Sequence, residues 1–110
     1  MSYDENRISD LIDGGHEQQR QMETHRLKTI RPYFEECFGN SKTFEVRIND
    51  RSFKKGDTVY LMDYDVETNT YSGRELRCTI LYVLSEYSAI KKGYVVFSFR
   101  IDQYIKATTS

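Results

Sequence analysis

Four charged residues near the middle of the chain, Lys42, Glu45, Arg47 and Arg51, have the types and spacing that could do chemistry. An arginine offers a planar fork that suits a phosphate or a base edge, and a neighbouring glutamate can hold that fork in one orientation. Lys42 adds a mobile positive charge for a phosphate or a carbonyl oxygen. The set therefore predicts a site for an anion or a nucleobase. The alternative interpretation is a solvated ion pair, which contributes little to stability.

The segment that must position these side chains alternates between apolar and polar residues. Successive side chains of a strand point to opposite faces, so Glu45 and Arg47 share one face of the predicted strand. Phe44, Val46 and Ile48 share the other face, and we expect this apolar face to pack in the core. The charged face would then display the functional groups.

The rest of the chain predicts a small barrel of the α+β class, built mainly from strands. Besides the central strand, we expect strands at residues 25–30, 58–64, 74–84 and 94–101. One helix is expected at residues 32–38, because Pro32 suits a first helical turn and the apolar Phe34, Cys37 and Phe38 recur at helical spacing. Five strands, with one helix between the first and second, favour a closed or nearly closed barrel over an open sheet with exposed edges.

The composition indicates one domain preceded by an acidic segment. Among the 110 residues, 16 Lys plus Arg nearly cancel 17 Asp plus Glu, so net charge gives no sign of a nucleic-acid or membrane partner. Residues 1–24 nevertheless hold six acidic and two basic side chains. We expect an acidic arm at 1–24, a domain at 25–105 and a frayed tail at 106–110. The arm is either a mobile, partly helical tail or a docking element that packs on the domain or on a second copy through Ile8, Leu11 and Ile12.

Cysteine and histidine positions predict neither a disulfide nor a metal site. Cys37 and Cys78 are isolated, and no secretory segment or membrane-spanning apolar run is present, so we expect a cytoplasmic protein with two buried thiols. His16 and His25 lack a metal-ligand spacing with these cysteines, and we expect no metal and no cofactor. His25 is instead expected at the start of a strand, near the cleft.

Two aromatic residues could add stacking surfaces to the central site. Most aromatic side chains of the chain alternate as core residues. Phe53 and Tyr64 lie near turns beside basic residues, so we expect these two to be the better candidates for stacking a base.

The order of several short motifs resembles the ASCH domain (activating signal cointegrator homology) of the PUA-like superfamily, in particular a small bacterial and phage branch. The similarity covers about residues 25–101 and rests on His25-Arg-Leu-Lys28, Pro32-Tyr-Phe-Glu35, Lys42-Thr-Phe-Glu45-Val-Arg47, Asn49-Asp-Arg51 and Gly56-Asp57. The family usually has a glycine two residues before the lysine, where this chain has Asn40. Asparagine also tolerates the left-handed conformation, so the turn can be kept.

The resemblance implies a barrel whose helix and lysine-bearing strand border a cleft, with RNA or a nucleotide as the ligand. The ligand-binding residues expected on this basis are Lys42, Glu45, Arg47, Arg51, His25 and Phe53.

Two other functions stay open. One branch of the ASCH family hydrolyses the acetyl amide of N4-acetylcytidine with a lysine, a threonine three residues later and a glutamate before the last strand. Lys42 matches that lysine, but Glu45 stands in place of the threonine, and Glu86 is the acid available before the last strand. A hydrolase would therefore use Lys42 as an electrostatic stabiliser and Glu45 as a general base on water. A module that binds a phage or host protein through the acidic arm is the remaining alternative.

Overall fold

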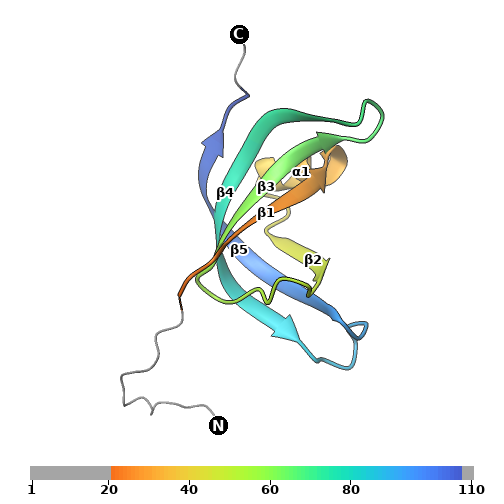
Figure 1. The fold of residues 1–110 in the computed structure, drawn as a ribbon, viewed down its shortest axis with the longest axis vertical. Helices are drawn as coiled ribbons and strands as arrows, with labels where there is room; N and C mark the ends of the chain where they lie inside the picture. The colour runs from red at the N-terminus through yellow and green to blue at the C-terminus, as the bar shows by residue number, and fades with distance from the viewer. Residues whose placement is uncertain (1–20, 108–110) are drawn as a thin grey trace.

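The computed structural model describes residues 21–107, which form a curled sheet with one short helix (Figure 1). The elements are β1 (Thr24–Ile30), α1 (Arg31–Phe38), β2 (Phe44–Ile48), β3 (Thr58–Asp65), β4 (Thr70–Ser85) and β5 (Tyr94–Ile105). The predicted class, five strands and one helix between the first and second, is confirmed. The predicted acidic arm, except for its last residues, and residues 108–110 lie outside the described part of the chain.

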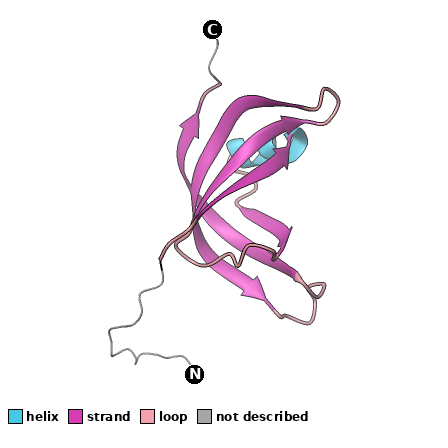
Figure 2. Cartoon of the chain, in the orientation of Figure 1, coloured by secondary structure: helices cyan, strands magenta, loops and turns pink. Residues whose placement is uncertain are grey.

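The five strands form one mixed sheet that curls into a half-barrel (Figure 2). Their spatial order is β1-β3-β4-β5-β2, in which β1 and β3 are parallel and the other neighbours are antiparallel. The register of β4 against β5 shifts twice, between Arg77 and Cys78 and between Ile80 and Tyr82. Such irregularities bend strands and help a sheet to curl. Within residues 21–107, β1 and β2 are the two edge strands, so the barrel stays open between them.

The core lies on the concave side of the sheet, beneath α1. Helix α1 contributes Phe34 and Cys37, which are fully buried against apolar side chains of the strands. Cys78 is buried in the same cluster, so the prediction of two buried free thiols is confirmed. Pro32 lies in the first turn of α1, and Asn40 takes the left-handed φ of 66° just after the helix. The sequence signals at both ends of the helix therefore act as expected.

The orientation of β2 is the opposite of the one predicted. Val46 is 55% exposed, and Phe44 and Ile48 are also exposed, whereas Glu45 is only 4% exposed. The expectation that the apolar face of this strand packs in the core is therefore wrong. Glu45 and Arg47 point to the concave side, where neighbouring cations compensate the buried carboxylate, and the apolar side chains cover the outside of an edge strand.

Candidate functional site

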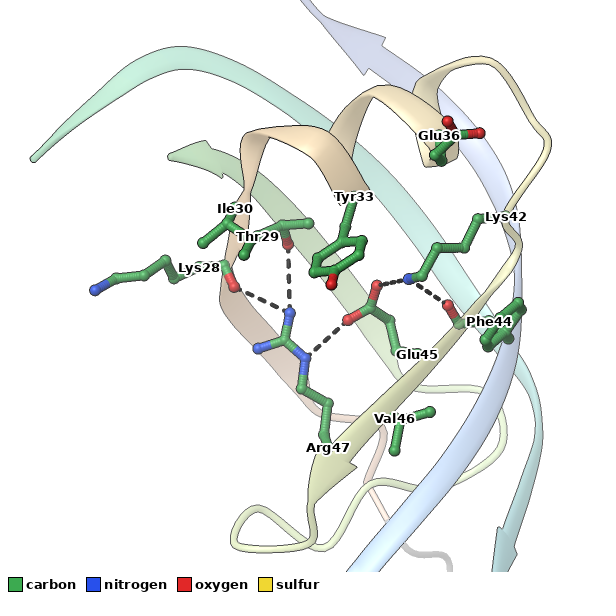
Figure 3. A pocket seen from close by; sticks show the side chains of 10 residues that line it. All are labelled: Lys28, Thr29, Ile30, Tyr33, Glu36, Lys42, Phe44, Glu45, Val46 and Arg47. Carbon is green, nitrogen blue, oxygen red and sulfur yellow. Dashed lines mark hydrogen bonds and ion pairs between the residues drawn. The ribbon is translucent and has the colours of Figure 1, made fainter. Parts of the chain in front are cut away.

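A cavity of about 700 Å³ lies on the open side of the half-barrel, between β1, α1 and β2 (Figure 3). Three segments line it: Lys28, Thr29 and Ile30 of β1, Tyr33 and Glu36 of α1, and Lys42, Phe44, Glu45, Val46 and Arg47 in and just before β2. The size falls within the usual range for small-molecule sites. Lys42, Glu45 and Arg47, which were predicted as site residues, thus meet in one concavity.

Glu45 is the centre of an ion cluster in this cavity. One carboxylate oxygen, Oε2, accepts from Lys42 Nζ at 2.5 Å, and the other, Oε1, accepts from Arg47 Nε at 2.8 Å (Figure 3). A buried carboxylate is costly unless its charge is paired and its oxygens are hydrogen-bonded. Lys42 and Arg47 meet both needs, and Glu45 in turn fixes the direction of both cations.

Arg47 also connects β2 to β1 across the open side. Its Nη2 donates to the carbonyl oxygen of Lys28 at 3.0 Å and to Thr29 Oγ1 at 3.4 Å. Nη1 makes no hydrogen bond to any residue between 21 and 107, and it remains available to a ligand (Figure 3). Further along the same opening, Arg51 Nη1 donates to the carbonyl oxygen of Arg26 at 2.9 Å. Arg47 and Arg51 therefore link β2 and the turn that follows it to β1.

Two aromatic rings flank the ammonium group of Lys42. Its Nζ lies 5.1 Å from the ring centre of Phe44 and 5.9 Å from that of Tyr33, and it donates to the carbonyl oxygen of Phe44 at 2.7 Å. Both rings are exposed and line the cavity. Sequence reasoning missed both residues, because Tyr33 precedes the buried Phe34 on a short helix and Phe44 was assigned to the core. Phe44 lies at the rim of the cavity because the two faces of β2 point the opposite way from the prediction.

Cys37 lies behind the cluster but is not set up as a nucleophile. Its Sγ is 3.8 Å from Lys42 Nζ and 3.9 Å from Glu45 Oε2, and the thiol is fully buried. Burial raises the pKa of Cys37 to about 11, although the Lys42 charge opposes that shift. Since the thiolate is the reactive form, this side chain is a neutral packing residue at ordinary pH.

The remaining predicted residues lie outside the large cavity. Arg51 borders a smaller cavity of about 220 Å³, which shares Arg47 with the large one and also touches Phe53. His25 and Phe53 are buried, with His25 Nε2 2.9 Å from Asp57 Oδ2 and the two rings edge to face at 4.8 Å. The structure thus places His25 in the core rather than in the cleft. Phe53 is 5% exposed, so its ring face is covered and does not offer the stacking surface expected of it.

Two further residues considered from the sequence also lie away from the cavity. Tyr64 lies on β3, where its hydroxyl donates to Asn69 and the ammonium of Lys28 sits 4.3 Å from its ring centre. Glu86, the acid that a hydrolase would need, borders a different cavity with Lys91 and Gly93. Lys42 and Glu45, the two residues that a hydrolase would use, therefore meet in the cavity without Glu86.

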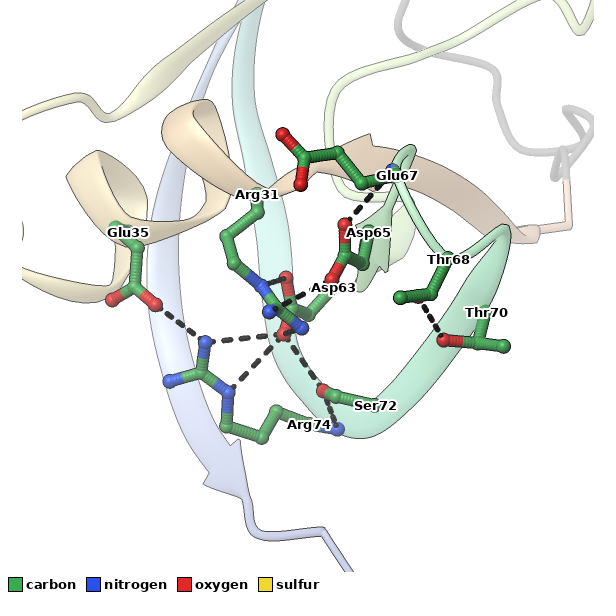
Figure 4. Close-up of polar contacts among 9 residues, drawn as sticks. All are labelled: Arg31, Glu35, Asp63, Asp65, Glu67, Thr68, Thr70, Ser72 and Arg74. Atoms are coloured by element: carbon green, nitrogen blue, oxygen red, sulfur yellow. Dashed lines mark hydrogen bonds and ion pairs between the residues drawn. The ribbon is translucent and has the colours of Figure 1, made fainter.

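A second ion cluster fixes the helix that forms one wall of the site (Figure 4). Asp63 of β3 is fully buried and accepts from Arg31 Nε and Nη2, from Ser72 Oγ, and from Arg74 Nε and Nη2. Arg74 also pairs with Glu35 on α1. Because Arg31 begins α1, these contacts join the first and second turns of the helix to β3 and β4. They consequently hold Tyr33 over the cavity.

Metal and membrane features are absent from the part of the chain that the structure describes. No group of three or more His, Cys, Asp or Glu side chains there could hold a metal ion. No helix among residues 21–107 is long and apolar enough to cross a membrane.

These features define a small half-barrel domain with a charged cavity between its two edge strands. The family model described as "Domain of unknown function (DUF3850)" matches residues 24–99, and the chain belongs to this family. The matched range contains every residue that lines the cavity. No curated protein matches the sequence.

Proposed function

We propose that this DUF3850 domain binds a nucleotide, free or within RNA, in the cavity between β1, α1 and β2. The observation that carries the proposal is the convergence of Lys42 and Arg47 on the buried carboxylate of Glu45 beside two exposed aromatic rings. The half-barrel, the position of the helix and the order of the motifs also support the proposed relationship to ASCH domains.

The charges around Glu45 favour an anionic ligand. Two cations, Lys42 and Arg47, share the single carboxylate of Glu45, so this ion cluster keeps one net positive charge, whereas the ammonium of Lys28 lies at the ring of Tyr64 outside the cavity. Glu45 is already paired, and it holds Arg47 so that Nη1 stays free to donate. An arginine held in this way can meet a phosphate without losing much side-chain freedom on binding.

The aromatic rings supply the apolar part of a nucleotide site. Tyr33 and Phe44 are exposed at the rim, where a base could stack on either ring. Such a site combines a base-stacking surface with a phosphate-binding group a short distance away, and both ends of a nucleotide are then recognised. An ion pair kept only for solubility would need neither the rings nor the concavity.

The contacts give less support to the hydrolase alternative. A general base needs a free lone pair directed at the water that it activates. Each oxygen of Glu45 already accepts a hydrogen bond from a cation, so the carboxylate is held toward Lys42 and Arg47 and not toward a water. Glu86 also lies outside the cavity. We therefore place binding ahead of hydrolysis.

Binding is tested with a fluorescein-labelled single-stranded oligoribonucleotide in an anisotropy titration, followed by competition with the four nucleoside monophosphates. The test variant is the triple change Lys42→Ala, Glu45→Gln and Arg47→Ala. It removes both cations and also the carboxylate, because a double change to the cations alone would leave Glu45 buried and unpaired, which is strongly destabilising. The matched control is Arg100→Ala, which changes the net charge by the same amount on the exposed surface of β5.

The wild-type domain should bind with an affinity that falls as salt rises, and Arg100→Ala should bind almost as well. The triple variant should lose binding, and any residual salt dependence should be shallower by about one unit of log-log slope per lost phosphate contact. Retention of RNA and nucleotides by a folded triple variant would contradict the proposal. Conversion of N4-acetylcytidine to cytidine by the wild type, abolished by Glu45→Gln, would favour the hydrolase instead.

A further inference from the structure

The free edge of β2 borders the cavity, and the pairing of the strand fixes which backbone groups it presents. In an antiparallel pair, alternate residues direct both N–H and C=O toward the partner strand, and the residues between them direct both groups away. The carbonyl oxygen of Thr43 accepts from Phe99 N, and Asn49 N donates to the carbonyl oxygen of Gly93. The backbone N–H and C=O groups of the odd-numbered residues in this stretch therefore point toward β5.

The backbone N–H and C=O groups of the even-numbered residues consequently point toward the open side of the half-barrel. Phe44 confirms this orientation, because its carbonyl oxygen accepts from Lys42 Nζ inside the cavity. Val46 is the next even residue, and β2 has no strand on that side within residues 21–107. Its N–H and C=O are therefore directed together into the cavity. Its side chain lies on the exposed outer face of β2, away from Glu45 and Arg47 (Figure 3).

We infer that the N–H and C=O of Val46 read the hydrogen-bonding edge of a nucleobase that stacks on Tyr33 or Phe44. In a sheet, the two groups of such a residue bond a single residue of the neighbouring strand, so they form one closely spaced donor and acceptor. The Watson–Crick edge of every common base also carries an adjacent donor and acceptor. The inference rests on the proposed function and adds to it that the base, and not only the phosphate, is recognised.

This mode of recognition predicts which ligands bind. The ligand needs an unblocked base edge, because a methyl group on the ring nitrogen would remove one partner and occupy its space. It also needs to be single-stranded or free, since a paired base has no Watson–Crick edge to offer. The domain should discriminate little between unmodified bases, because one donor and one acceptor are common to all of them.

The test uses a proline at the centre of β2. Val46→Pro removes the N–H that faces the cavity and leaves the ladder to β5 intact, and proline is accepted on an edge strand when its nitrogen faces outward. Ile48→Pro is the matched control, because it removes an N–H from the same free edge of β2 at a residue that does not line the large cavity. Affinities are measured by isothermal titration calorimetry for uridine 5′-monophosphate, 3-methyluridine 5′-monophosphate and ribose 5-phosphate, after circular dichroism has shown that each variant is folded.

Val46→Pro should weaken the binding of uridine 5′-monophosphate by about tenfold or more, as expected for a lost hydrogen bond that leaves a base atom unsatisfied. Ile48→Pro should bind as the wild type does, and neither variant should change the binding of ribose 5-phosphate. In the wild type, 3-methyluridine 5′-monophosphate should bind as weakly as the unmodified nucleotide binds to Val46→Pro.

The outcomes separate this inference from the proposed function. If Val46→Pro binds uridine 5′-monophosphate as tightly as the wild type, or if the methylated and unmethylated nucleotides bind the wild type equally, base reading by Val46 is wrong and nucleotide binding stands. If the wild type binds none of these ligands and no single-stranded oligoribonucleotide either, the proposed function itself is wrong. Should Val46→Pro fail to fold, the comparison of the two nucleotides on the wild type still decides.

Discussion

Asp63 should be the carboxylate on which the stability of the helix and its wall of the cavity depends most. The change Asp63→Asn keeps the size of the side chain and removes its charge. It weakens the hydrogen bonds from Arg31, Ser72 and Arg74, the shortest of which, from Ser72 Oγ, is 2.7 Å long. The amide also presents an N–H₂ group to side chains that are themselves donors. The loss should therefore exceed that of a surface ion pair.

The geometry bounds the size of this effect. Stranding one partner of a fully buried ion pair costs about 3–5 kcal/mol. Here Arg31 is 41% exposed and Arg74 is 23% exposed, and each keeps a second acidic partner, Asp65 and Glu35 respectively. We therefore expect a loss of about 2–3 kcal/mol, which lowers the midpoint of thermal unfolding by roughly 10–20 °C for a domain of this size.

Acid titration supplies a second readout with a definite sign. Burial raises the pKa of Asp63, but the hydrogen bonds from Arg31, Ser72 and Arg74 outweigh it, and the net pKa lies below the ordinary value of 3.8. A carboxyl group whose pKa is lower in the folded state stabilises the fold above its unfolded pKa. That contribution is lost as pH falls below 3.8. The difference in the free energy of unfolding between wild type and Asp63→Asn should thus be largest at neutral pH and should decrease in acid.

Urea unfolding followed by circular dichroism, repeated from about pH 7 to about pH 2.5, measures both effects through the linear extrapolation. Asp65→Asn is the control, because Asp65 is partly exposed and its single ion pair should contribute under about 1 kcal/mol. A loss for Asp63→Asn no larger than that for Asp65→Asn, or a loss that stays constant down to the acid end, would refute the reasoning.

Two further predictions concern buried thiols and a strained turn. Burial raises the pKa of Cys37 to about 11 and that of Cys78 to about 12. A thiol reagent at about pH 8 should therefore label neither residue in the folded protein and both residues in urea. Fast labelling without urea would contradict this prediction and show that the site opens. Gly56 has a φ of 93°, so Gly56→Ala should destabilise the domain by about 1 kcal/mol or more, whereas Gly39→Ala, where φ is −78°, should cost less. Equal losses in urea unfolding would contradict the strain argument.

Local signals in the sequence were enough to predict the elements of the fold. Alternation marked the strands, and Pro32 with Gly39 and Asn40 marked the ends of the helix. The convergence of the three site residues also followed from local spacing. Glu45 and Arg47 share one face of β2, and Lys42 lies two residues before the strand begins. These features depend on neighbours along the chain, and sequence patterns report such neighbours directly.

Long-range packing was where the sequence was insufficient. An alternating strand has two faces, and its period is the same whichever face turns inward. Apolar content suggested Phe44 and Val46 for the core, but the structure turns Glu45 inward because Lys42 and Arg47 are there to pair with it. The burial of Phe53 against His25 joins residues far apart in sequence, and no local pattern reports that contact.

The orientation of β2, with Glu45 turned inward and the apolar side chains turned outward, is the strongest argument that this fold binds a ligand. An apolar residue in place of Glu45 would fill the same space without the cost of desolvating a carboxylate, and buried ion pairs are often no more stable than such replacements. Stability alone therefore does not account for a charged group turned inward while Val46 and Ile48 stay exposed. The arrangement is accounted for if the cations held by Glu45 have a partner that enters from solvent. That partner would approach where, within residues 21–107, β1 and β2 each have an edge with no neighbouring strand, which is where the cavity lies.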